Sequence, residues 1–149
     1  MGKTATVVLV TLLVAIPAFL LAPHAPLGPA IWPAPVELTP PPTPGQVKLF
    51  QVLGVFEALS LGLGVSFLIL GWPVMQRAAG PSRWRAFVMY LGIAWLLVNW
   101  WLHDGFHMVA GLNPSGLLGI EYAFHVTLIL AGTALAYGFA TMGRQSPVR

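Results

Sequence analysis

Histidine and carboxylate side chains recur at helical spacing in two neighbouring stretches of the sequence. His103 and His107 are four residues apart, and Glu121 and His125 repeat that spacing further along. Residues four apart lie on the same face of an α-helix. Two imidazoles on one helix, facing a carboxylate and a third imidazole on another, are donors that bind a divalent metal ion such as zinc or iron. The spacing therefore predicts a metal site with all four residues as ligands.

Two further acids are candidates for the catalytic role at such a site. Asp104 follows His103 and lies about 100° round the helix from it, and Glu57 lies in the preceding apolar stretch. A carboxylate beside a metal-bound water can act as a general base or as a fourth ligand. We expect Asp104 or Glu57 to do this. The candidates for hydrogen bonding to the ligands are Asn99, Tyr122 and Thr127.

The composition defines the kind of protein that must position these groups. Of 149 residues, 57% are hydrophobic and 7% are charged, and the mean hydropathy is +0.80. A soluble domain carries about 25% charged residues, so a soluble enzyme, a disordered chain and a nucleic-acid-binding protein are excluded. The chain has no cysteine, which excludes disulfides and thiolate ligands. The sequence indicates a membrane protein that has no nucleic-acid partner.

Four apolar stretches are long enough to cross a bilayer, which takes about 20 residues of helix. We therefore expect an all-α integral membrane protein, with four transmembrane helices in an antiparallel bundle that forms a single domain over residues 1–149. The first stretch is expected to be an uncleaved helix, and Ser115 is expected to cap the last one. A proline-rich segment, 23–46, is expected to form an outer loop over the bundle. The predicted spans are 4–22, 48–71, 86–110 and 116–141.

The basic residues predict the orientation. With a cytoplasmic N-terminus and four spans, both termini are inside, and six of the seven basic residues face the cytoplasm. Only Lys48 then faces outward. The six are Lys3, Arg77, Arg83, Arg85, Arg144 and Arg149. Counting about 1.5 Å per residue places the histidines and acids about 4 to 14 Å from the outer ends of their spans. We expect a multi-pass protein of the cell membrane whose site opens to the extracytoplasmic side.

Several functions fit this pattern. The first is a metalloenzyme acting on a lipophilic substrate that enters from the surrounding lipids. The second is a non-catalytic accessory or assembly subunit of a larger membrane complex, or a homo-oligomer, whose polar residues pair structurally: His103 with Glu121, and His107 with Asp104. Proton handling is the third, and haem ligation between His125 and a histidine of the preceding helix is the fourth.

Overall fold

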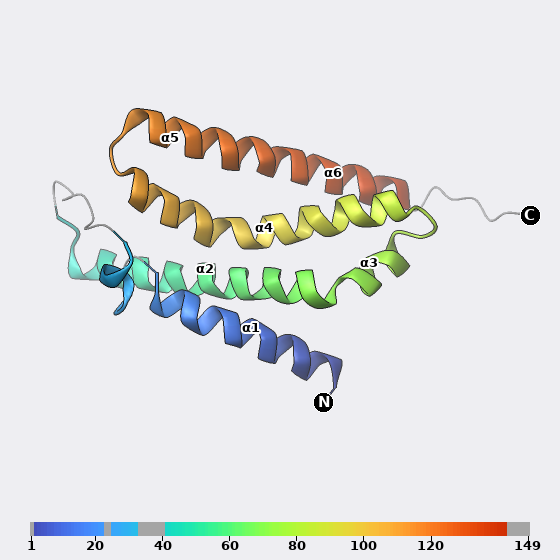
Figure 1. Cartoon of the computed structure of the whole chain (residues 1–149), viewed down its shortest axis with the longest axis horizontal. Coiled ribbons are helices and arrows are strands. Elements are labelled where there is room, and N and C mark those ends of the chain that lie inside the picture. The colour runs from blue at the N-terminus through green and yellow to red at the C-terminus, as the bar shows by residue number, and fades with distance from the viewer. Residues whose placement is uncertain (1, 23–24, 33–40, 143–149) are drawn as a thin grey trace, which may run out of the picture.

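Four long helical segments lie side by side in the computed structural model, which describes residues 2–22, 25–32 and 41–142 (Figure 1). The described residues contain no strand. All four segments are long and apolar enough to cross a membrane. They are α1 (Lys3–Leu20), α2 (Pro44–Leu70), α4 (Arg83–Ala110) and a composite of α5 (Pro114–Glu121), a π-helical turn (Tyr122–Val126) and α6 (Thr127–Met142). The connections include a 3₁₀ turn (Gly28–Ala30) and the short helix α3 (Trp72–Ala78).

Helix α2 begins earlier than the apolar pattern indicates because polar residues start it. Thr43 and Gln46 form a capping box, in which the Gln46 N–H donates to Thr43 Oγ1 (3.3 Å) and the Thr43 N–H donates to Gln46 Oε1 (2.8 Å). Pro44 occupies the first helical position, where it needs no N–H partner. The outer loop, which was expected over 23–46, therefore ends before Pro44. Its residues 23–24 and 33–40 lie outside the described part of the chain.

The turn between α4 and α5 brings two of the long segments together. Gly111 ends α4 with φ of 55°, a left-handed conformation that favours glycine. Asn113 caps α5, since its Oδ1 accepts from the N–H groups of Ser115 (3.0 Å) and Gly116 (3.2 Å). The sequence-based assignment of Ser115 as the cap was wrong. The tight turn places α4 directly beside α5 and α6.

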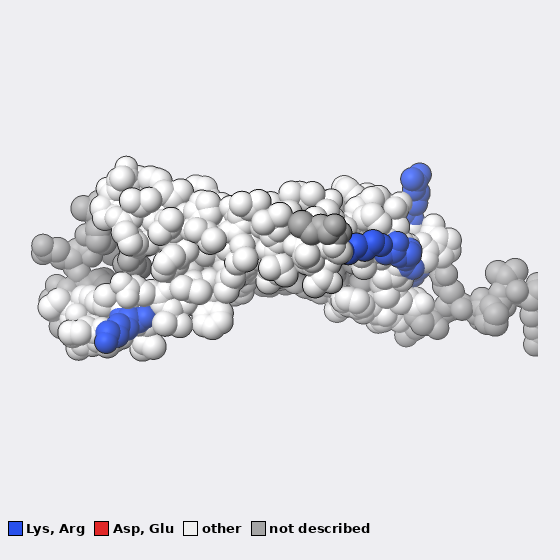
Figure 2. Space-filling view, turned by 90° about the horizontal axis from the view of Figure 1, so that it is seen from below, with Lys and Arg blue, Asp and Glu red and all other residues white. Residues whose placement is uncertain are grey.

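Small residues allow the long helices to approach closely. A Cβ atom on Gly62 would meet the Thr11 carbonyl oxygen of α1, and one on Gly138 would meet the Met89 side chain of α4. Such close contacts between helices are typical of packing in membranes. Large apolar side chains instead cover the outside, and Figure 2 shows basic side chains toward the two ends of one face with an uncharged middle.

A tryptophan fastens the first connection to the end of the bundle. The Trp32 indole N–H donates to the Leu21 carbonyl (2.6 Å), and its ring meets Trp101 edge-on with centroids 5.9 Å apart. Trp101 in turn donates to the Ala18 carbonyl at the end of α1 (3.0 Å). Gly105 of α4 leaves the space that the Trp32 ring fills, since a Cβ there would lie 2.6 Å from the ring. Trp32 is thereby held against α1 and α4.

Candidate metal centre

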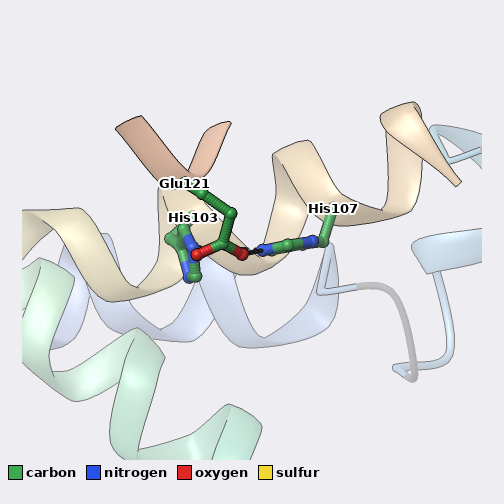
Figure 3. Close-up of side chains that lie close together, drawn as sticks. All are labelled: His103, His107 and Glu121. Carbon is green, nitrogen blue, oxygen red and sulfur yellow. Dashed lines mark hydrogen bonds and ion pairs between the residues drawn. The ribbon is translucent and has the colours of Figure 1, made fainter. Parts of the chain in front are cut away.

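Three of the predicted site residues come together between α4 and α5. His103 Nε2 and His107 Nε2 are 3.1 Å apart, and His107 Nε2 is 3.4 Å from Glu121 Oε1. One donor atom from each of the three residues lies within 4.8 Å of the others. Figure 3 shows the Glu121 carboxylate between the two imidazole rings. All three side chains are half-buried. In the described part of the chain, His103, His107 and Glu121 form the candidate metal centre.

The spacing of these atoms suits one metal ion. A tetrahedral zinc ion holds its nitrogen and oxygen ligands at about 2.0 to 2.2 Å, which separates neighbouring ligand atoms by about 3.3 Å. Two of the three separations, 3.1 and 3.4 Å, match this edge length, and the third is within 4.8 Å. The donor set is two imidazoles and one carboxylate, which is found both at catalytic zinc sites and at non-haem iron sites with open positions. The residues therefore fit a zinc or iron ion.

Local helix geometry positions each ligand. His103 and His107 lie on one face of α4, with ring centroids 4.5 Å apart and ring planes at 89°. Glu121 is the last residue of α5, and the π-helical turn starts at the next residue. A π turn takes in one more residue than an α-helical turn and occurs frequently at functional sites. It changes which face of the segment the residues beyond Glu121 occupy.

His125 binds the carboxylate from the other side. Its Nδ1 is 2.6 Å from Glu121 Oε2, while Glu121 Oε1 faces His107. Its ring centroid is 5.4 Å from that of His103, and its side chain is 56% exposed. The structure thus places His125 next to the three donors but in contact with the carboxylate. Hydrogen-bonding partners of metal ligands commonly make contacts of this kind.

Asp104 and Glu57 are not among the three grouped donors and lie together toward α1 and α2. Both line a pocket of about 70 Å³ among α1, α2 and α4, whose apolar walls include Phe19. Asp104 is close enough to both Glu57 and His103 for its charge to act on them. Glu57 lies beyond it, away from the three donors.

The residues expected to support the ligands have different partners. The Asn99 amide is buried and donates to the Trp95 (2.8 Å) and Leu96 (3.0 Å) carbonyls of its own helix. Thr127 Oγ1 accepts from the Trp95 indole N–H (3.0 Å), and Tyr122 is 69% exposed. Among the described residues, no hydrogen bond joins Asn99, Tyr122 or Thr127 to a donor atom of the site.

An aromatic wall beside the site was missed by sequence reasoning. Phe124, in the π-helical turn, is buried and lies 5.1 Å from the His103 ring, centroid to centroid. Trp95 stacks on Phe124 with centroids 5.6 Å apart and planes at 21°. The eight-residue spacing of Trp95 and His103 on one helix face was an available signal, whereas nothing in the sequence marked Phe124. The wall shields one side of the His103 imidazole from the surroundings.

Comparisons with models of known protein families, with curated proteins and with solved structures give no match to this chain.

Proposed function

We propose that this protein is a four-span membrane protein that binds a divalent ion, zinc or iron, through His103, His107 and Glu121. The observation that carries the proposal is the placement of three donor atoms at separations that suit one ion. Charged and polar groups within a span are costly unless they are paired or hydrated, and they commonly mark function. A bound cation would satisfy the carboxylate and both imidazoles at once.

The membrane arrangement that we propose is an antiparallel bundle with both termini in the cytoplasm. The start of α1 and the end of α6 lie toward one end of the molecule, as do the basic residues of α3 and the start of α4 (Figure 1). This distribution agrees with an excess of positive charge inside. The metal centre lies toward the other end, near the α4–α5 turn, and so would face the extracytoplasmic side.

The same site would support catalysis on a lipophilic substrate. Three protein ligands leave a coordination position open, and an ion bound in this way lowers the pKa of water or polarises a substrate oxygen. His125 would hold the Glu121 carboxylate in place, and the Phe124 wall would limit access of water. Asp104 follows His103 in the chain and lines the neighbouring pocket rather than the metal centre, so its role as the proton acceptor stays a prediction from the sequence. The apolar outer surface gives a lipophilic substrate access from the lipids.

A second candidate function rests on the continuity of the polar contacts. His125, Glu121, His107 and His103 form an unbroken series of side chains at 2.6, 3.4 and 3.1 Å. A series of this kind could hold or move a proton without metal, or brace an accessory subunit of a larger complex or homo-oligomer. Haem ligation is less well supported, since Glu121 lies among the histidines that would bind the iron.

Metal analysis of the purified protein tests the first proposal. We expect near-stoichiometric zinc or iron in detergent-purified protein, measured by mass spectrometry of the elements, and its loss in the His103→Ala and His107→Ala variants. His24→Ala is the matched control, because His24 is the one histidine of the sequence that the proposed site does not use. A wild-type protein that is metal-free and does not bind zinc or iron on titration would contradict the proposal and leave the proton-handling and accessory functions.

A further inference from the structure

A second pocket lies at the basic end of the molecule, far along α4 from the metal centre. It has a volume of about 280 Å³ and is formed by α4 and α6. Its polar and aromatic lining comes from Ser82, Trp84 and Arg85 at the start of α4, and from Tyr137 and Thr141 near the end of α6. Basic, hydroxyl and indole groups around one pocket are suited to an anion at a membrane surface.

Arg85 is held in a fixed position beside this pocket. Its Nε (3.0 Å) and Nη2 donate to the Ala79 carbonyl, and its Nη1 donates to the Thr141 carbonyl (3.4 Å). The side chain is half-buried, so it is not a freely mobile surface cation. A guanidinium has five N–H groups, and these three bonds leave one on each terminal nitrogen. An anion can bind the remaining two without displacing the contacts that hold the arginine.

The positive charge around Arg85 has no acidic residue near it in the sequence. Arg77 and Arg83 lie near Arg85 in the chain, and no Asp or Glu occurs in 72–100 or 126–149. The pocket also adjoins the start of α4, where the helix dipole favours a negative charge. An anion from outside the chain would supply a counter-charge to these arginines.

We propose that this pocket binds the phosphate headgroup of an anionic glycerophospholipid. The lipid is favoured over a soluble anion because apolar side chains continue from the polar rim: Val88, Met89 and Ala134 line the same pocket. Trp84 and Tyr137 are both 72% exposed, which is the placement of aromatic residues at a membrane interface. The phosphate would contact Arg85 and Tyr137, while the acyl chains would extend along the apolar sides of α4 and α6.

Lipid titration of the detergent-purified protein, followed by native mass spectrometry and by melting temperature, tests this proposal. We expect phosphatidylglycerol to bind and stabilise the protein more than phosphatidylcholine does. Arg85→Gln should weaken phosphatidylglycerol binding about tenfold and Tyr137→Phe about threefold. Arg77→Gln, which removes the same charge outside the pocket, is the matched control and should retain the preference.

Tyr137→Phe keeps the test decisive if Arg85→Gln fails to fold, because it removes only a hydroxyl from an exposed side chain. Equal losses in Arg77→Gln and Arg85→Gln would show general charge attraction and overturn the proposal. The proposal would also be overturned if phosphatidylglycerol binding were unchanged in both single variants, Tyr137→Phe and Arg85→Gln. The same holds if inorganic phosphate stabilised the protein as much as phosphatidylglycerol does. These results do not depend on the metal centre, since none of the variants alters a residue of that site.

Discussion

Glu121 binds His125 through one carboxylate oxygen, at 2.6 Å from Nδ1, and presents its other oxygen to the histidines of α4. The two oxygens therefore have separate tasks. One contacts a neighbour on the same helical segment, and the other faces the histidines of α4. In the proposed metal centre, a carboxylate held in this way would keep its donor atom in place before an ion binds.

This division predicts a graded response to substitution. His107→Ala and Glu121→Gln should abolish metal binding, because each removes a direct donor. His125→Ala should weaken zinc affinity about 10- to 100-fold, the usual effect of losing a partner that orients a ligand. Competition titration with a zinc indicator measures both. Equal losses in all three variants would make His125 a direct ligand, as the sequence pattern suggested.

Metal binding should depend on pH. The ion binds neutral imidazoles, whose ordinary pKa is about 6.5, so stabilisation by metal is present above this pH and is lost as the pH falls through it. For two histidine ligands we expect about 100-fold weaker affinity at pH 5.5 than at pH 7.5. Melting temperatures with and without a strong chelator measure the effect. Identical melting temperatures with and without chelator at both pH values would contradict the metal centre.

The proposed orientation can be tested with reporters. A reporter that is active only in the cytoplasm should be active when fused after Arg149 and silent when inserted near Pro41. The physical reason is that basic residues gather at one end of the bundle. Segments rich in lysine and arginine stay on the cytoplasmic side of a membrane. The reverse pattern of activity would place the metal centre on the cytoplasmic side.

Close packing of α1 on α2 should make one glycine irreplaceable. Gly62→Ala would drive a methyl group into the backbone carbonyl of Thr11, and we expect it to cost about 1 to 3 kcal/mol of stability through overpacking. Gly132→Ala is the control, because nothing lies within 4 Å of the added Cβ and alanine favours the helix. Thermal unfolding in detergent compares the two, and equal melting temperatures would refute this account of the α1–α2 contact.

Helix length and the histidine spacing could be predicted from sequence because each depends on local properties. Apolar runs of sufficient length indicate the spans, and an interval of four residues on one helix places His103 beside His107. The π-helical turn could not be predicted, since one extra residue in a turn leaves no mark in composition or periodicity. As a result, the sequence grouped His125 with Glu121 as a metal ligand. It could not show that His125 contacts the Glu121 carboxylate.

The relation of Asp104 to the histidines shows a second limit. Counting residues gives the depth of a side chain along its helix, but not which neighbouring helix its face meets. Depth alone put Glu57 level with the histidines, and the helical angle from His103 put Asp104 at the edge of their face. The packing order, with α2 and α5 on different sides of α4, separates them into the pocket beside α1 and α2. That order is a property of the assembled helices.

The edge-on pair formed by Trp32 and Trp101 gives the molecule an internal optical reporter. Two indoles with centroids 5.9 Å apart and planes at 65° have coupled electronic transitions, and a fixed chiral arrangement of this kind gives a signed band in near-ultraviolet circular dichroism. Since one indole belongs to the first connection and the other to α4, the band reports whether that connection is seated. Its amplitude would follow the seating of Trp32 on α4 without any added label.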